Sequence, residues 1–426
     1  MRIVHLNTQD SFGAGRAVRR IHAGLLALGE DSSLIVSQKT SPDPTVTQFE
    51  PDRRPLARLR HLQRQRMITR DADRYLRNRP SGFEWFSDDR GALGSELIRR
   101  LPAADIITLN WIADFVDLPS FFRERPPAAK TVWRLSDMNP FTGGCHIDAG
   151  CGRFTGSCGH CPQLSSPGAN DLSRRIWQRK SEAYARAGKG TLHLVALSTS
   201  QAEDVRRSSL LGSFPLTIIP CAVDVSTFFP HPKAAARNCL GLPAEEPIVL
   251  MAAQSFGRRN KGAELLRDAL ALLHGMRRPL IVSVGEGHPD VPAEFEHVHW
   301  GSVGDDRLLG LFYSAADLLA FPSLQEGFGQ TIVEALACGL PVVGFATGGM
   351  RDAVRPGVTG FIAPAKTSEA LAEELQTALT DVGRLRGMSD ACRETAETQF
   401  SMESVARRYQ ELYRSLLADG SPSSTG

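Results

Sequence analysis

Hydrophobic and polar positions alternate in blocks along this chain. Short runs rich in Val, Ile and Leu are followed by segments with apolar residues every three or four positions, a pattern that predicts an α/β protein with parallel sheets. The predicted strands begin at Arg2, Ser33, Asp105, Thr131 and His193 in the first half and at Pro247, Leu280, Asp317 and Pro341 in the second. Helical periodicity predicts helices over residues 16–28, 263–273, 306–315 and 330–338.

The chain is too long, at 426 residues, for one ordinary hydrophobic core, so we expect two domains. Residues 217–232, TIIPCAVDVSTFFPHP, end a predicted strand and continue as proline-bearing chain, which is typical of a linker. We expect one Rossmann-like domain over 1–220, a second over 221–400 and a helix over 401–418 that packs back on the first domain. Residues 419–426 are predicted to be a disordered tail.

The segment FPSLQEGFGQTIVEALACGLPVV, residues 321–343, places Glu326 and Glu334 around the glycines Gly327 and Gly329. Glycines let backbone amides approach a ligand closely, and a helix start presents free N–H groups to a phosphate. Each carboxylate can accept hydrogen bonds from neighbouring sugar hydroxyls. The segment therefore predicts a site for a nucleotide sugar.

Residues 321–345 resemble the signature of the retaining GT-B glycosyltransferases of family 4, in which seven residues separate two glutamates. The resemblance extends over nearly the whole second half, through QSFGRRNKGAELL (254–266), VGEG (284–287), HWGSV (299–303) and ATGGMRDAV (346–354). The order and spacing of these segments make the resemblance specific. It implies the GT-B fold, with two Rossmann-like domains whose parallel sheets face each other across a cleft.

The resemblance implies that Arg259 and Lys261 clamp the donor diphosphate, with Arg258 as the alternative arginine that points inward. Pre-placed cations meet the charge that develops on a diphosphate leaving group, so catalysis is expected to be metal-independent and to require no cofactor. Glu326 would contact the transferred sugar and Glu334 the ribose. The other donor contacts that the resemblance implies are Gly327, Phe328, Gly329, Gln330 and Thr331 at sugar and phosphate, and Gly301, Ser302 and Val303 at the base. Because backbone groups would read the base, both GDP- and UDP-sugars stay open as donors.

Two loops of the first half carry further candidates. In DSFGAGR, Gly13, Gly15 and Arg16 follow the first strand, and the resemblance places them opposite the donor phosphates; the alternative is a turn that only permits tight strand-to-helix packing. TVWRLSDMNPFTGGCH resembles the family loop that carries a histidine and an aspartate beside the reacting sugar. Here Ser136 stands in the histidine's place, followed by Asp137, which is expected to be catalytic. This departure keeps a catalytically silent binding module as an alternative.

The segment CHIDAGCGRFTGSCGHC holds four cysteines, Cys145, Cys151, Cys158 and Cys161. Four thiolates can surround one tetrahedral zinc ion and leave no open position for substrate, so the segment predicts a structural zinc site. Free thiols or a redox pair are the alternatives, and His146 and His160 are additional candidate ligands. The surrounding TGGCH and CPQL resemble a subset of transferases for exopolysaccharide and colanic acid.

Between Arg53 and Arg79, ten arginines accompany only two aspartates, with Leu56, Leu59 and Leu62 at roughly helical spacing. The pattern indicates a solvated helix in an insertion or a basic amphipathic surface that rests on anionic lipid or guides a lipid-diphosphate acceptor. No run approaches the roughly 20 apolar residues of a membrane span. We expect a cytoplasmic protein, peripheral on the inner face of the membrane, with no nucleic-acid partner.

The predicted function is transfer of a sugar, with retention, from a GDP- or UDP-sugar to a hydroxyl of a glycan or lipid-linked oligosaccharide, in bacterial exopolysaccharide or cell-surface polysaccharide biosynthesis. A nucleotide-sugar epimerase on the same architecture and a catalytically silent module are the alternatives. A glycoside hydrolase is disfavoured, because it would have no phosphate for the arginine–lysine pair to bind.

Overall fold

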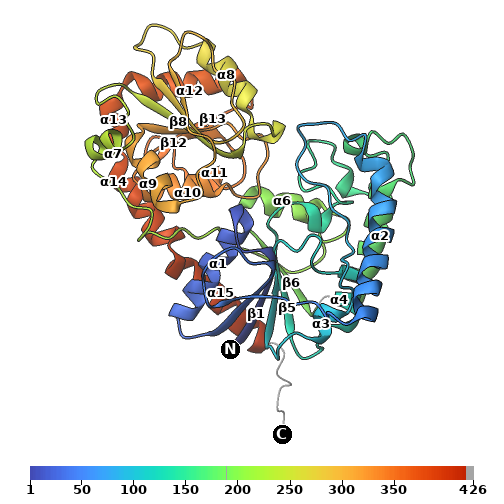
Figure 1. Cartoon of the computed structure of the whole chain (residues 1–426). Helices are drawn as coiled ribbons and strands as arrows, with labels where there is room; N and C mark the ends of the chain where they lie inside the picture. Colours follow the sequence, from blue (N-terminus) through green and yellow to red (C-terminus); the bar gives the residue numbers. More distant parts are fainter. Residues whose placement is uncertain (189, 419–426) are drawn as a thin grey trace. The chain divides into compact units, whose positions relative to one another are not determined.

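The computed structural model describes residues 1–188 and 190–418, and these residues form two compact units (Figure 1). Among the described residues, the first unit contains 1–188, 190–197, 201–219 and 406–418, and the second contains Ser198–Ser200 and Pro220–Val405. The last helix, α15 (Met402–Ala418), therefore lies mostly in the first unit. The predicted tail at 419–426 lies outside the described residues.

The first unit is built on a parallel sheet with the strand order β3-β2-β1-β4-β5-β6-β7. Its strands are β1 (Arg2–Gln9), β2 (Asp31–Gln38), β3 (Val46–Gln48), β4 (Ile106–Leu109), β5 (Lys130–Arg134), β6 (Leu192–Ala196) and β7 (Leu216–Ile218). From β1 the strand order runs to β2 and β3 on one side and to β4 and the later strands on the other. Open α/β sheets bind ligands at such a switch point, which here lies between β1 and β4.

Helices cover this sheet and connect its strands. They are α1 (Phe12–Ala27), α2 (Pro55–Leu76), α3 (Glu96–Arg99), α4 (Leu118–Glu124), α5 (Leu172–Ala187) and α6 (Thr199–Arg207), with 3-10 turns η1 (Asn139–Phe141), η2 (Arg153–Thr155) and η3 (Pro162–Leu164). The core holds the apolar side chains of β1, β4 and β5, and the rings of Phe122, Trp133 and Tyr184 pack edge to face within it. Strands buried on both faces explain the near-continuous Val, Ile and Leu runs.

Glu30 joins the two ends of the first unit. Its carboxylate pairs with the Met1 amino group at 2.7 Å and accepts a hydrogen bond of 2.6 Å from Gln410 of α15. Burial opposes ionisation of Glu30, but these bonds outweigh it and lower its pKa. The final helix is thus fixed to the start of β1 by a specific polar contact.

The second unit has a parallel sheet with the order β10-β9-β8-β11-β12-β13. Its strands are β8 (Ile248–Ser255), β9 (Leu280–Glu286), β10 (His297–His299), β11 (Leu318–Phe321), β12 (Val342–Phe345) and β13 (Gly360–Ala363). Its helices are α7 (Lys233–Cys239), α8 (Ala263–Ala271), α9 (Asp306–Ala315), α10 (Gln330–Ala337), α11 (Met350–Ala353), α12 (Ser368–Thr380), α13 (Val382–Gly387) and α14 (Ser389–Thr395), with the 3-10 turn η4 (Arg259–Lys261) and the π turn η5 (Ala396–Phe400).

Candidate functional site

Two loops at the carboxyl edge of the second sheet meet at an ion pair. Lys261, in η4 after β8, pairs with the carboxylate of Glu326, which follows β11. The Ser323 hydroxyl donates to the same carboxylate at 3.3 Å. The side chains of Lys261 and Glu326 keep 20% and 15% of their surface exposed, so solvent and ligands can reach the pair. The structure therefore brings together a cation and an acid that the sequence separates by 65 positions.

The backbones of these loops touch. The Leu324 amide donates to the carbonyl of Asn260 at 2.7 Å, and the Asn260 side chain donates to the carbonyl of Gln325 at 3.2 Å. Gly262 has φ +67°, and a Cβ there would lie 2.0 Å from the carbonyl oxygen of Pro322. Only glycine allows this approach, so the position of Glu326 depends on a contact without side chains.

The loop after β12 closes on the same segment. The Gly349 amide donates to the carbonyl of Phe328 at 2.7 Å, and a Cβ on Gly348 would lie 2.8 Å from the Cβ of Glu326. Gly329, with φ +92°, precedes the first residue of α10, and a Cβ there would meet the Phe321 ring at 2.6 Å. These glycines leave the amino end of α10 beside Glu326 with backbone close to the surface.

Glu334 lies inside α10 and is only 2% exposed. The Tyr313 hydroxyl donates to its carboxylate at 3.2 Å. Burial, and then the Glu334 carboxylate, raise the pKa of the neighbouring Cys338. A buried carboxylate is stable only with hydrogen-bond donors around it. A pair of sugar hydroxyls would supply further donors to Glu334.

The loops after β8 and β10 join the end of β9. The Phe256 amide donates to the carbonyl of Glu286 at 2.9 Å, and the Gly285 amide to the carbonyl of Gly301 at 2.8 Å. Gly301 and Val303 are half-buried and Ser302 is exposed. The family resemblance predicts that these three residues contact the nucleobase. The structure thus gives these residues a place on the same sheet edge, while their roles stay predictions.

Three histidines gather at β9 and β10, and this cluster was not predicted from the sequence. His297 and His299 hydrogen-bond to the hydroxyl of Ser283 at 2.7 and 2.8 Å, and the His288 ring lies 4.9 Å from both rings. Burial, and then the neighbouring histidines, lower the pKa of His297 to about 4. The HVHW spacing, which puts both rings on one face of a strand, was the available signal.

The remaining donor candidates of the second unit differ in accessibility. Arg259 is exposed, whereas Arg258 is half-buried. Either arginine therefore stays a candidate for the contact with the donor diphosphate. Phe328 is buried, and Gln330 and Thr331 are half-buried at the first turn of α10.

In the first unit, close packing against the loop after β1 explains why residue 15 is a glycine. A Cβ on Gly15 would lie 2.5 Å from the backbone of Asp10, so strand and helix approach too closely for any other residue. This supports the packing alternative for Gly15. Gly13 and Arg16, at the start of α1, are half-buried, and their role at a phosphate stays a prediction.

The loop after β5 contains a network that the sequence did not reveal. His146 hydrogen-bonds to Asp137 at 2.5 Å through Nδ1 and to the Ser87 hydroxyl at 2.9 Å through Nε2. Trp111 donates to the same Asp137 oxygen at 2.8 Å. Ser136, where the family resemblance expects histidine, accepts a 3.0 Å bond from Arg134. An imidazole therefore does lie beside Asp137, but it comes from His146.

The cysteine-rich segment brings its four thiols into one region of the first unit. Within residues 1–188 and 190–418, no group of three or more His, Cys, Asp or Glu side chains is arranged to hold a metal ion. Burial, followed by the neighbouring thiols Cys151 and Cys161 among other groups, raises the pKa of Cys158 to about 11. Cys145 interacts electrostatically with the other three thiols, so the four cysteines do share one region. Zinc binding stays a prediction.

Among the described residues, no helix is both long enough and apolar enough to cross a bilayer.

The chain is similar to known proteins in sequence and in fold. Residues 246–381 match the family described as glycosyl transferases group 1. The chain is similar to D-inositol 3-phosphate glycosyltransferase of Xylanimonas cellulosilytica, with 32% identity over 236 residues, covering 52% of this chain and 56% of that protein. It thus spans about half the length of the curated relatives it matches.

Two solved structures align over nearly the whole chain. Sucrose-phosphate synthase from Thermosynechococcus elongatus has a TM-score of 0.67 at 20% identity, covering 99% of this chain and 100% of that one. HepE of Anabaena, solved with UDP-glucose, has a TM-score of 0.67 at 18% identity, covering 97% and 100%. The chain therefore has the two-domain fold of the GT-B glycosyltransferases, and part of its second unit is similar to the glycosyl transferases group 1 family.

Proposed function

We propose that this protein is a retaining glycosyltransferase that moves a sugar from a nucleoside diphosphate sugar to a hydroxyl acceptor. The observation that carries the proposal is the Lys261–Glu326 pair, set beside the amino end of α10 with Glu334 buried one helical segment further on. These residues lie within the segment that matches the group 1 family. The Anabaena neighbour was solved with UDP-glucose and with UDP, which supports a donor of this class.

The proposed chemistry places positive charge where the leaving group becomes negative. The bond between the anomeric carbon and the diphosphate breaks, and Lys261 and Arg259 stabilise the departing diphosphate. The amide groups at the start of α10 add a partial positive charge. Glu326 holds hydroxyls of the transferred sugar and Glu334 those of the ribose.

Retention follows when the acceptor oxygen attacks from the face that the diphosphate leaves. A new bond forms between this oxygen and the anomeric carbon, and the acceptor proton passes to an oxygen of the departing diphosphate. No metal ion is needed in this scheme, because the cationic side chains supply the countercharge. Asp137 is proposed to orient the sugar, held in turn by His146 and Trp111.

The proposed acceptor is a glycan or a lipid-linked oligosaccharide in cell-surface polysaccharide biosynthesis, met at the cytoplasmic face of the membrane. The resemblance of the TGGCH and CPQL segments to exopolysaccharide transferases supports this choice. The curated relatives are named D-inositol 3-phosphate glycosyltransferases, so an inositol phosphate belongs in any acceptor panel.

The test is a panel of UDP- and GDP-sugars scored for binding by thermal shift and for slow donor hydrolysis. Glu326→Gln should reduce hydrolysis by about tenfold or more, since it removes a charged hydrogen-bond partner of the sugar. Glu294→Gln, an exposed glutamate of the same unit, is the matched control and should behave as wild type. The proposal fails if no donor binds or if both variants equal wild type. Isomerised donor would instead identify an epimerase, and bound donor that never turns over would identify a silent module.

A further inference from the structure

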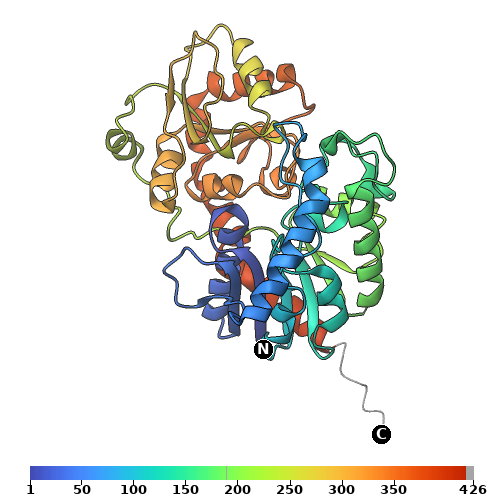
Figure 2. The same ribbon diagram turned by 45° about the vertical axis from the view of Figure 1, so that its right-hand side comes forward.

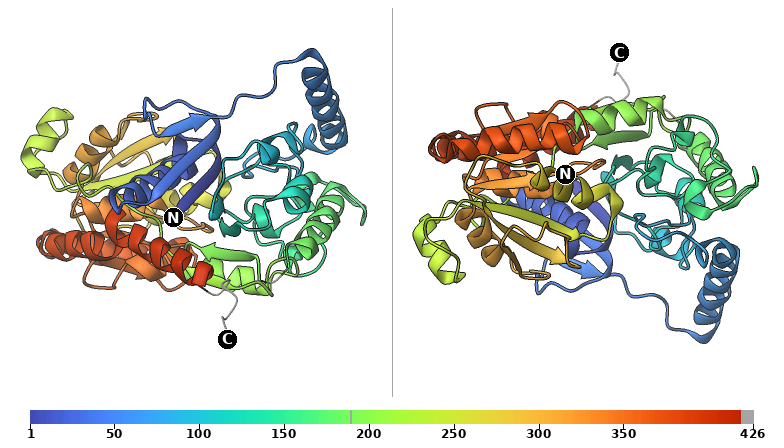
Figure 3. Two further views of the ribbon diagram at one scale, coloured as in Figure 1. Left: turned by 90° about the horizontal axis from the view of Figure 1, so that it is seen from below. Right: turned by 90° about the horizontal axis from the view of Figure 1, so that it is seen from above.

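Helix α2 of the first unit presents large apolar side chains to solvent. Leu56, Leu59, Leu62 and Met67 are 71%, 51%, 52% and 47% exposed, and only Ile68 and Ala72 of this helix are buried. In Figure 2 the helix faces the viewer along its whole length, and in both views of Figure 3 it lies at the edge of the first unit, joined to β3 by extended chain. Four leucine and methionine side chains exposed on one helix need an explanation, because single exposed apolar residues are common but clusters are not.

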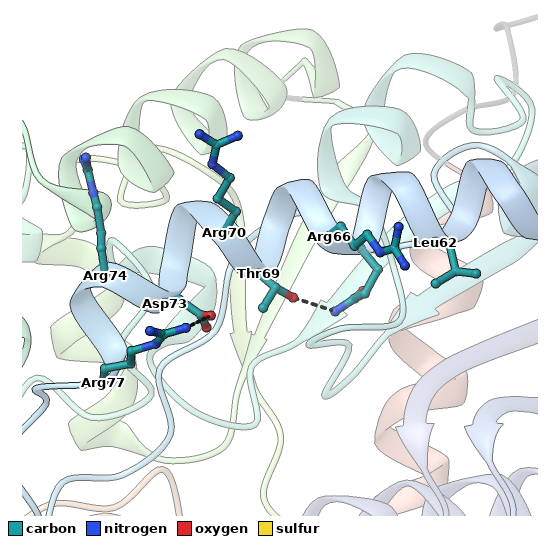
Figure 4. Close-up of a pocket in the computed structure, with 8 residues that line it drawn as sticks. Leu62, Arg66, Thr69, Arg70, Asp73, Arg74 and Arg77 are labelled. Atoms are coloured by element: carbon teal, nitrogen blue, oxygen red, sulfur yellow. Dashed lines mark hydrogen bonds and ion pairs between the residues drawn. The ribbon is translucent and has the colours of Figure 1, made fainter.

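Arginines continue the line of the leucines along one side of the helix. The spacing of three or four residues puts the following side chains in one stripe: Leu59, Leu62, Arg66, Arg70, Arg74 and Arg77. With 3.6 residues per turn, Ile68 and Ala72 fall on the opposite side. Six of the residues in and beside the stripe line a surface hollow of about 460 Å³ together with Gln65 and Asp73, and Figure 4 shows Arg70 and Arg74 extending on the same side of the helix.

The inner side of α2 is fixed to the unit by polar contacts of its own. His61 pairs with Glu96 at 2.8 Å, Asp71 pairs with Arg90 at 3.0 Å, and Arg64 pairs with Asp117. The outer stripe is therefore not needed to hold the helix in place.

The positive charge of the stripe is largely uncompensated. Arg77 pairs with Asp73 at 3.1 Å, and Arg74 donates to the Tyr75 hydroxyl at 2.7 Å. In the part of the chain that the structure describes, Arg66 and Arg70 have no acidic partner. The surface thus combines exposed leucines with arginines whose countercharge must come from outside.

We propose that the outer face of α2 docks on an anionic lipid bilayer, with the leucines at the acyl boundary and the arginines at the headgroups. Long arginine side chains reach headgroups while their stems cover apolar surface. Nucleic acid would match the arginines but would leave the leucines in water, so the bilayer fits both halves of the stripe. The inference extends the proposed function, because a lipid-linked acceptor would be met at this surface.

The test is co-sedimentation of the full-length protein with vesicles of phosphatidylcholine containing phosphatidylglycerol, compared with pure phosphatidylcholine. The triple variant Arg66→Gln, Arg70→Gln, Arg74→Gln keeps good helix formers and should weaken binding to the anionic vesicles by about a hundredfold, since each arginine near such a surface contributes roughly fivefold to binding. Exposed arginines on other helices provide the control with the same charge change: Arg186→Gln, Arg206→Gln, Arg207→Gln. This control should bind as wild type does.

A second variant, Leu56→Gln, Leu59→Gln, Leu62→Gln, separates lipid from other polyanions. It should also lose vesicle binding, whereas loss in the arginine variant alone would show attraction to any polyanion and overturn the proposal. Equal binding to neutral vesicles, or no binding to either kind, would overturn it as well. Donor hydrolysis in solution should be unchanged in both variants, so failure of docking and failure of the proposed transferase activity are read from different experiments.

Discussion

Gly262→Ala is predicted to damage both the stability of the second unit and its donor site. Gly262 has φ +67°, a conformation that costs an L-residue about 1–2 kcal/mol. The added Cβ would also lie 2.0 Å from the carbonyl oxygen of Pro322, a backbone atom that cannot move without its loop. Such overpacking costs about 1–3 kcal/mol, and its relief shifts the loop that carries Glu326.

Gly241 offers a matched control for the backbone part of this cost. Its φ is +63°, and a Cβ there has nothing within 4 Å. Gly241→Ala should therefore cost only the conformational part, about 1–2 kcal/mol. Since 1 kcal/mol shifts Tm by roughly 2–4 °C in a domain of this size class, Gly262→Ala should melt several degrees below Gly241→Ala.

Scanning calorimetry and donor titration of the two variants provide the assay. Gly262→Ala should have the lower Tm and the weaker donor affinity, while Gly241→Ala should keep wild-type affinity. Equal melting temperatures together with equal affinities would show that the close approach of Gly262 and Pro322 does not position Glu326, and the reasoning would be refuted.

Four further predictions follow from the same structure. Glu334→Gln should weaken binding of a nucleoside diphosphate by about tenfold, measured by calorimetry, because it removes a charged acceptor; unchanged affinity would contradict a ribose role. His146→Gln should lower kcat more than it raises KM by loosening Asp137, and an unaltered kcat would contradict that role. Elemental analysis of purified protein should find about one zinc, as expected for a four-thiolate site, that is lost in Cys158→Ser; a metal-free wild type would retire the zinc prediction. Because burial lowers the pKa of His297 to about 4, the unfolded state binds more protons below the ordinary value near 6.5, so stability should fall as pH drops from 6.5 toward 4, and His297→Gln should reduce that loss in denaturant titrations.

The sequence predicted the interior strands of both sheets better than their edge strands. The nine predicted strands correspond to β1, β2, β4, β5, β6, β8, β9, β11 and β12, and the two-domain α/β fold is confirmed. Three edge strands of three or four residues each, β3, β10 and β13, were not predicted, and the fourth edge strand, β7, was predicted only as a strand that ends at the start of the linker. An edge strand this short has neither a long apolar run nor enough alternation to produce a pattern.

The candidate site was predictable where chemistry lies in one motif and not where it depends on packing. The order of motifs indicated both Lys261 and Glu326, and the structure pairs them. The sequence could not show that Gly262 holds their loops together, because that contact is between backbones. It also could not assign His146 to Asp137, because the imidazole comes from a segment whose cysteines suggested a different role.

Recognition of the donor diphosphate by the Lys261 cation is the central feature of the proposed site, and calorimetry on Lys261→Gln tests it directly. Wild-type protein should bind a nucleoside diphosphate more tightly than the corresponding monophosphate. Lys261→Gln should bind the diphosphate about tenfold more weakly than wild type, as expected for loss of a charge-assisted hydrogen bond. Arg277→Gln, which removes an exposed arginine of the same unit, should keep the wild-type preference. A Lys261→Gln protein that still prefers the diphosphate as wild type does would contradict the proposed site.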